Sequence, residues 1–404
     1  MPGEETVYEE FGVPPVINAV ATRTQVGGAR VRDGVQENMA RAEEAHVHVA
    51  ELQGKASELI AEATGADAGY VSAGAASGLL LCAAACMARN NFDRMAQLPD
   101  TTGFADEIII PKAHRLKYDI GLRASGATLV DVGHVSHHPI GGGVDKVQPW
   151  QIESAINEDT AAIAYVKRPH NVLKLETVTK IASEHDIPVI VDAASEVPPK
   201  TNLTSVIEAG ADLVVYSGGK GLRGPQSTGI VAGRKDLIQS VALLHVPDGY
   251  NDNIWNPPSQ LIDRDQLPAG TPATAIGRPS KVGPAEIIGL LTALEKFINQ
   301  DDEAILAEWR NRADHIANQL AESPFLRVTL SDGKDKASGV PKVIVGLSDD
   351  SPLSAIELVN NLRQEDPRIW LGERRIHLNE FTISVQELQD DEADYMIERI
   401  LAQF

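Results

Sequence analysis

Three side chains that could take part in one reaction follow apolar stretches typical of strands. Lys220 lies between two groups of glycines in SGGKGLRGPQ, directly after the run LVVYS. Asp192 ends the run IPVIVD, and His114 comes shortly after the run IIIP. A desolvated lysine amine can attack a carbonyl carbon. A carboxylate at the end of a buried strand must find a partner or lose its charge.

A fourth feature, SAGAAS at residues 72–77, is a turn of small residues before an apolar helix. The first N–H groups of a helix have no partner inside the helix, and the helix dipole favours an anion beside them. The segment therefore suits a phosphate group. Any tight turn between a strand and a helix also uses glycine and alanine, so its meaning depends on the other three features.

Each feature also has an ordinary structural interpretation. Asp192 could cap a helix, Lys220 could be a surface lysine, and His114 could be a core histidine. Together they match the requirements of one ligand, pyridoxal phosphate (PLP), which needs a lysine, a carboxylate beside its ring nitrogen, a flat stacking group and a phosphate site. We expect the glycines to let the cofactor approach the backbone closely.

Apolar runs and helical segments alternate along the middle of the chain. The expected strands are residues 106–114, 127–133, 161–167, 187–194, 211–217 and 229–234. Helical patterns separate most of them, at residues 118–125, 151–157, 175–186 and 204–210. This order predicts an α/β fold with a mostly parallel sheet covered by helices on both faces. Ligands of such sheets bind at the carboxyl ends of the strands, where these residues lie.

Three parts are expected along the chain. Residues 1–49 form an N-terminal loop and helix, residues 50–290 form the large cofactor-binding domain, and residues 291–404 form a smaller C-terminal α+β domain. The second boundary follows a loop rich in proline and glycine at residues 246–284. Residues 32–63 have helical periodicity and predict one long helix or two joined helices.

Five ordered segments resemble a known family. They are PPVINAVATRTQVGGARV, YVSAGAASGLLL, IPVIVDAASEVPPKTNL, SGGKGLRGPQSTGIVAGRKDLI and GRPSKVGPAEIIGLLTALEKF. Together they resemble the fold-type I PLP enzymes, and within them the selenocysteine synthase-like branch. The resemblance implies an aspartate aminotransferase-like large domain and a lyase of amino acid metabolism.

The resemblance also implies a role for each site residue. Lys220 would be the Schiff-base lysine, Asp192 the partner of the pyridine nitrogen, His114 the group stacked on the ring, and Ala194 its contact on the other face. The phosphate would be held by Ala75, Ala76, Ser77 and Ser217. Because a neighbouring subunit usually completes such sites, a homodimer or a larger assembly of dimers is expected, with Thr274, Arg278 and Lys281 in the segment that would reach across.

Charge argues against nucleic acid as a partner. The 404 residues include 36 Lys and Arg against 57 Asp and Glu, a formal net charge of −21. Selenocysteine synthase itself carries a tRNA-binding extension and a basic surface, and this sequence has neither pattern. We also expect no signal peptide and no membrane helix, and hence a cytoplasmic protein with a small-molecule substrate.

Several reactions remain open. A PLP lyase could abstract the α-proton of a small polar hydroxyamino acid or amino sugar acid and eliminate its β-substituent, with Lys220 as base. An aldolase or a racemase would use the same residues. A cofactor-bearing or degenerate protein of this fold could instead serve as a regulator or scaffold. Candidate arginines for an anionic substrate are Arg23, Arg30 and Arg374.

A metal site is the remaining alternative. His134, His137 and His138 lie within one short stretch, HVSHHPIGGGVD, but no helical spacing or carboxylate accompanies them. Cys82 and Cys86 are spaced for one face of an apolar helix, which indicates buried side chains. We therefore expect no metal.

Overall fold

The computed structural model describes residues 6–136, 143–144, 147–245, 251, 253–333 and 339–404. Two compact units make up the chain. One consists of residues 31–299, and the other of the flanking segments 1–30 and 300–404.

These units differ from the expected division in two places. The expected boundary after residue 290 falls inside helix α11 (Pro284–Ile298), and the chain divides after Asn299 instead. The expected N-terminal part is split after Arg30, because strand β1 (Val16–Ala19) pairs in parallel with β13 (Arg368–Leu371). The next helix, α2 (Val35–Glu43), packs against α11.

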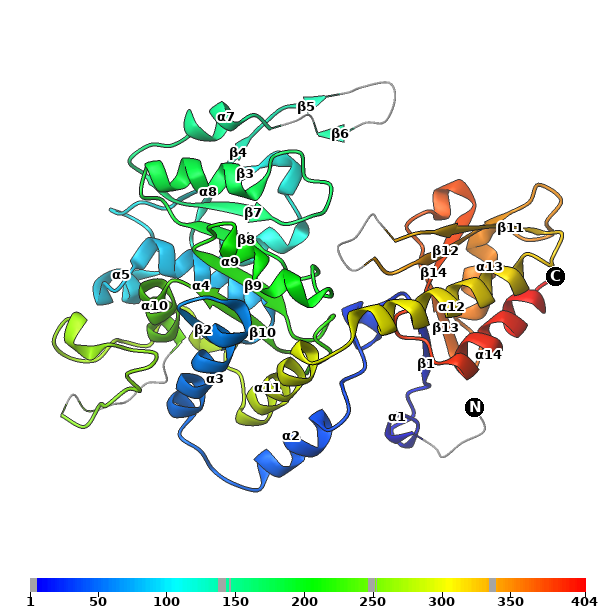
Figure 1. Ribbon diagram of the computed structural model, residues 1–404, viewed down its shortest axis with the longest axis horizontal. Helices are drawn as coiled ribbons and strands as arrows, with labels where there is room; N and C mark the ends of the chain where they lie inside the picture. The colour runs from blue at the N-terminus through cyan, green and yellow to red at the C-terminus, as the bar shows by residue number, and fades with distance from the viewer. Residues whose placement is uncertain (1–5, 137–142, 145–146, 246–250, 252, 334–338) are drawn as a thin grey trace. The chain divides into compact units, whose positions relative to one another are not determined.

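Seven strands among the described residues form the central sheet of unit 31–299 (Figure 1). Their order across the sheet is β2-β10-β9-β8-β7-β3-β4. Strands β9, β8, β7, β3 and β4 are parallel, and β10 is antiparallel to both of its neighbours. The mostly parallel sheet is thereby confirmed. Its strands are β2 (Ala68–Ser72), β3 (Glu107–Pro111), β4 (Thr128–Val132), β7 (Thr160–Val166), β8 (Val189–Asp192), β9 (Leu213–Ser217) and β10 (Gly229–Gly233).

Helices connect these strands and cover the sheet. Residues 32–63, expected as one or two helices, form two of them. The α-helices of the unit, besides α2 and α11, are α3 (Val49–Thr64), α4 (Ala75–Ala88), α5 (Phe92–Gln97), α6 (Ile120–Ala124), α7 (Pro149–Glu153), α8 (Leu175–Glu184), α9 (Ser205–Glu208) and α10 (Lys235–His245). Short 3-10 helices are η2 (Lys112–His114), η3 (Lys117–Asp119), η4 (Lys200–Leu203), η5 (Arg264–Gln266) and η6 (Arg278–Ser280), and a small hairpin joins β5 (Val135–Ser136) to β6 (Gly143–Val144).

Alternate side chains of the central strands enter two different cores. Ile108 and Ile110 of β3 pack with residues of α4 and α10, whereas Ile109 packs with residues of α3 and α8. In β9 the same alternation separates Val215 from Val214. Since helices cover both faces, both sets of side chains are apolar, and the strands are continuous apolar runs in the sequence.

The other unit is a small α+β domain, as expected. Its three-stranded antiparallel sheet has the order β11-β12-β14, and its core includes Trp309, Phe381 and Met396. Its elements, besides β1 and β13, are α1 (Val7–Glu10), η1 (Thr24–Val26), α12 (Asp302–Leu320), β11 (Leu326–Ser331), β12 (Lys342–Leu347), α13 (Ala355–Leu362), η7 (Ile376–Leu378), β14 (Glu380–Ser384) and α14 (Asp390–Leu401).

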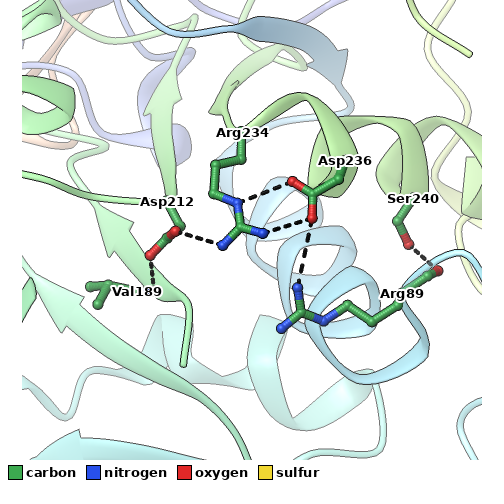
Figure 2. A network of polar contacts seen from close by, with 6 residues as sticks. All are labelled: Arg89, Val189, Asp212, Arg234, Asp236 and Ser240. Atoms are coloured by element: carbon green, nitrogen blue, oxygen red, sulfur yellow. Dashed lines mark hydrogen bonds and ion pairs between the residues drawn. The ribbon is translucent and has the colours of Figure 1, made fainter. Parts of the chain in front are cut away.

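The amino-terminal edge of the parallel strands is closed by ion pairs (Figure 2). Arg234, just after β10, contacts Asp212, just before β9, at 3.1 Å and Asp236 at 2.8 Å. The second carboxylate oxygen of Asp212 accepts the backbone N–H of Val189 at the start of β8. Arg89 lies 3.9 Å from Asp236. These four charged side chains are thus paired with one another.

In the part of the chain that is described, no helix is both long enough and apolar enough to cross a membrane.

Candidate active site

Strand register places the turn at residues 72–77, the expected phosphate site, beside the loop at residues 217–226 that carries Lys220. Ser72, the last residue of β2, pairs with Gly229 at the start of β10, and Gly229 pairs with Ser217 at the end of β9. The turn 72–77 and the loop 217–226 therefore leave the sheet at the same edge. Ser217 is buried there.

Asp192 lies at the same edge, one strand further along. It is in register with Val215 of β9 on one side and with Val166 of β7 on the other. The Asp192 side chain is buried, and its Oδ1 accepts the backbone N–H of Ala194 at 3.0 Å. Asp192 and His114 line the same cavity.

His114 is a buried, neutral ring. Its Nδ1 accepts the backbone N–H of Val166 at 3.3 Å, and its ring meets Tyr165 edge-on at 4.6 Å between centroids. Burial, together with the positive charge of Arg168, lowers the pKa of His114 to about 4. The imidazole can therefore present a flat, uncharged face near neutral pH.

Lys220 is half-buried, with its amine directed at polar groups of the site. Its Nζ donates to Ser195 Oγ at 2.9 Å and lies 5.8 Å from the centre of the Tyr118 ring. Burial lowers the pKa of Lys220, and the negative charge of Asp192 opposes that shift. A lowered pKa increases the fraction of neutral amine, which is the nucleophilic form. Asp192 is therefore near enough for its charge to act on the Lys220 amine.

The glycines around Lys220 serve the packing of the loop itself. A Cβ at Gly218 would lie 2.0 Å from Thr228 Oγ1, and a Cβ at Gly221 would lie 2.0 Å from the backbone oxygen of Val197. We expected these glycines to admit a cofactor. Contacts within the protein already exclude any side chain at both positions.

The turn at residues 74–77 has the properties expected of an anion site. Gly74 adopts φ 85°, a left-handed value that favours glycine, and helix α4 begins after it without a side-chain cap. Ala75, Ala76 and Ser77 form its first turn, whose N–H groups have no intrahelical partner. Among the described residues no group hydrogen-bonds the buried Ser77 Oγ. A phosphate would satisfy these donors.

Arg168 and Glu196 were not among the residues expected at the site. Arg168 Nη1 donates to Glu196 Oε1 at 2.9 Å and to the backbone oxygen of Lys167 at 2.7 Å. Burial raises the pKa of Glu196, and Arg168 opposes this shift. Arg168 follows the end of β7, and Glu196 follows the end of β8. Asp192 was recognised because it is a polar residue at the end of an apolar strand, and a similar position could have pointed to these two residues. The same holds for Ser195.

The three arginines suggested for the substrate belong to the other unit. Arg23 lies 3.7 Å from Glu373, and Arg30 forms an ion pair with Glu392. Arg374 is exposed. Their part in substrate binding stays a prediction.

The segment expected to reach across to a neighbouring subunit lines a second cavity. Thr274, Arg278 and Lys281 line it together with Leu98 and Pro99. This cavity differs from the one lined by His114 and Asp192.

The histidine stretch is only partly described. His134 is exposed, and His137 and His138 lie outside the described residues. Cys82 and Cys86 are buried free thiols, as their spacing indicated. Within the described ranges, no three His, Cys, Asp or Glu side chains are grouped to hold a metal ion.

Comparison with known proteins identifies the family. The class-V aminotransferase family model matches residues 141–353. A 5'-C-glycyluridine monooxygenase-decarboxylase from Streptomyces sp is 30% identical, with 97% of this chain and 90% of the relative covered. The chain belongs to the class-V aminotransferase family. The fold-type I assignment is confirmed, and the cofactor is PLP.

Two further relatives of this class-V chain support the assignment to the selenocysteine synthase-like branch. D-glucosaminate-6-phosphate ammonia lyase from Salmonella typhimurium is 27% identical, with 98% of this chain and 96% of the relative covered. A solved structure of that enzyme has a TM-score of 0.79 at 26% identity and covers 98% of both chains. An L-seryl-tRNA(Sec) selenium transferase from Aquifex aeolicus is 27% identical over 61% of this chain and 53% of its own.

In this class-V aminotransferase homologue, residues at the carboxyl edge of the sheet suit the separate chemical groups of PLP. The open N-terminus of α4 and the unpartnered Ser77 Oγ suit the phosphate. The buried carboxylate of Asp192 suits the ring nitrogen, and the neutral His114 ring suits the face of the pyridine. The amine of Lys220 would suit the covalent bond to the cofactor.

Proposed function

We propose that this protein is a PLP-dependent lyase that abstracts the α-proton of a small polar hydroxyamino acid or amino sugar acid and eliminates its β-substituent. The observation that carries the proposal is the likeness, over almost the full length of both chains, to an ammonia lyase of an amino sugar acid. The arrangement of Lys220 and Asp192 at one strand edge supports it.

The residues of the site have distinct tasks in this reaction. PLP, when bound, accepts the electrons left behind by the departing α-proton. Lys220 Nζ takes up that proton, and its lowered pKa favours the neutral amine needed for this step. Ser195 Oγ, 2.9 Å away, orients the amine. Asp192 holds a proton on the ring nitrogen, and the buried His114 excludes water from one face.

Product analysis tests the proposal. The protein, loaded with PLP, is incubated with a panel of D- and L-hydroxyamino acids and amino sugar acids. Loss of a β-hydroxyl as water, followed by hydrolysis of the released enamine, yields ammonia and a 2-keto acid. We expect both products in equal amounts, lost in Lys220→Ala and retained in Lys180→Ala, which changes an exposed lysine of α8.

Other product patterns would contradict the lyase proposal. Release of an aldehyde without ammonia would indicate an aldolase, and inversion at the α-carbon without either product would indicate a racemase. A protein that retains no PLP and converts no member of the panel would indicate a regulator or scaffold.

A second candidate is oxidative decarboxylation. It is favoured by the 30% identity to a 5'-C-glycyluridine monooxygenase-decarboxylase over 97% of this chain. The two reactions differ in their use of oxygen. Substrate-dependent consumption of O2 with release of CO2 would support this candidate, whereas unchanged turnover under anaerobic conditions would exclude it and leave the lyase.

We further propose that the protein forms a homodimer, in which Thr274, Arg278 and Lys281 complete the site of the neighbouring subunit. Their position on a cavity apart from His114 and Asp192 supports this arrangement. Sedimentation equilibrium should give twice the mass of the 43.3 kDa chain, and a monomer would contradict the proposal. Two buried free thiols are in keeping with a reducing compartment, and we place the protein in the cytoplasm.

A further inference from the structure

The proposed reaction assigns no task to the charged pair of Arg168 and Glu196 at the strand edge. We propose that Arg168, held in place by Glu196, binds the α-carboxylate of the amino acid substrate. This inference rests on the proposed function only in requiring an amino acid as the substrate. It holds equally for elimination, aldol cleavage or decarboxylation.

Backbone contacts place the two residues before Arg168 beside His114 and Asp192. The two residues before it, Val166 and Lys167, end and follow β7. The N–H of Val166 donates to His114 Nδ1 at 3.3 Å, and the N–H of Lys167 donates to the backbone oxygen of Asp192 at 3.0 Å. Arg168 therefore leaves the sheet where the predicted ring-stacking and ring-nitrogen residues meet.

The positive charge of Arg168 influences the pKa of both His114 and Lys220. Burial is the main cause that lowers the pKa of His114 and of Lys220, and in each case the guanidinium of Arg168 contributes to the shift. Glu196 directly follows Ser195, whose Oγ contacts Lys220 Nζ. The ion pair and the amine thus belong to one cluster.

Glu196 holds one side of the guanidinium and leaves the other side available. Arg168 Nη1 donates two hydrogen bonds, to Glu196 Oε1 and to the backbone oxygen of Lys167. Its Nε and Nη2 have no acceptor among the residues that the structure describes. The Glu196 side chain is 4% exposed, whereas that of Arg168 is 31% exposed. An edge with two parallel N–H donors matches the two oxygens of a carboxylate.

The position favours the α-carboxylate over a more distant anion. The substrate amine takes the place of Lys220 Nζ, so the carboxylate carbon lies only two bonds from that nitrogen. An arginine whose charge acts on Lys220 is therefore within the range of this carboxylate. A distal phosphate would extend several bonds further from the amine.

Equilibrium binding to the PLP-loaded protein tests the inference. Glycine and glycinamide are the probes, because they share an amine and differ in the carboxylate, and neither has a stereocentre or a β-substituent. Binding is followed by the change in visible absorbance, without turnover. We expect the wild-type protein to bind glycine about 10- to 100-fold more tightly than glycinamide, as expected for charge-assisted hydrogen bonds.

Variants separate recognition from a purely structural ion pair. Arg168→Met should reduce the preference for glycine to less than about 3-fold. The double variant Arg168→Met with Glu196→Gln should do the same without leaving a buried carboxylate unpaired. The control is Arg399→Met, which removes a similar ion pair with Glu365 in the other unit and should keep the full preference.

Two outcomes would overturn the inference. If Arg168→Met and the double variant keep the preference for glycine, the pair is structural and the lyase proposal is unaffected. If the wild-type protein shows no preference, carboxylate recognition is absent. Failure of the lyase proposal is observed separately, as absence of ammonia and keto acid from the substrate panel while the preference for glycine persists.

Discussion

At the scale of single residues, the neutral state of His114 follows from its surroundings. The ring is buried, and its Nδ1 accepts a backbone N–H from Val166, so a proton added at that atom would break the bond. The positive charge of Arg168 disfavours protonation further. A neutral imidazole is also the form that can cover a planar ring without introducing a charge beside it.

This environment predicts a pH dependence of stability. The pKa of His114 is about 4 in the folded protein, against about 6.5 in an unfolded chain. Between these values the unfolded chain binds a proton that the folded chain does not. The free energy of unfolding should therefore fall as the pH falls from about 6.5 to 4, by up to about 1.4 kcal/mol per pH unit from this residue.

Urea denaturation of wild type and His114→Phe across this pH range measures the effect. The variant should show a shallower loss of stability on acidification, since phenylalanine is flat and does not titrate. His245, whose pKa is also lowered by burial, is present in both proteins, so the difference isolates His114. Parallel pH profiles would contradict the prediction.

At the scale of elements, the two edges of the parallel sheet differ in how their polar groups are satisfied. At the amino edge, Arg234, Asp212 and Asp236 pair with one another (Figure 2). At the carboxyl edge, Ser77 Oγ and Glu196 Oε2 are buried without a hydrogen-bond partner among the described residues. Buried polar atoms are normally satisfied, and a ligand bound at the carboxyl edge would supply partners for these two.

The lysine loop gives a prediction for matched glycines. A Cβ at Gly221 would meet the backbone oxygen of Val197 at 2.0 Å, whereas at Gly224 its nearest neighbour would be the Ala293 side chain at 3.2 Å. Gly221→Ala must displace the backbone next to Lys220, at a cost of about 3 kcal/mol in stability. Gly224→Ala requires a much smaller adjustment.

Covalent incorporation of PLP and urea denaturation compare these two variants. Gly221→Ala should incorporate less PLP and unfold at a lower urea concentration than the wild type, and Gly224→Ala should lie close to the wild type. Equal behaviour of the two variants would show that the loop tolerates a side chain beside Lys220, contrary to the packing observed here.

Short sequence patterns predicted the strands and the functional residues at their ends. They did not predict contacts between residues that are far apart in the sequence. Lys220 and Asp192 were recognisable because each follows a continuous apolar run. The bond between Lys220 Nζ and Ser195 Oγ joins positions 25 residues apart and depends on side-chain orientation. The pairing of β1 with β13 joins the two ends of the chain, and no local pattern marks it.

At the scale of the whole molecule, the net charge of −21 argues against nucleic acid as a partner. Nucleic acids bind proteins chiefly through Lys and Arg that neutralise phosphates and release counterions. A chain with 57 acidic against 36 basic residues has a net charge that repels a polyanion. The alignment with the selenium transferase from Aquifex aeolicus covers 61% of this chain, so the similarity to that enzyme does not extend over the full length.

We therefore predict that the protein does not bind tRNA. In an electrophoretic mobility assay at low salt, about 10 µM protein should leave the tRNA band unshifted, although this concentration exceeds the dissociation constants of many non-specific complexes. Low salt is the most demanding condition, because it strengthens every contact between a cation and a phosphate. A shifted band that disappears as salt is added would reveal a basic surface that the net charge conceals. In that case an aminoacyl-tRNA would again have to be considered as a substrate of this protein.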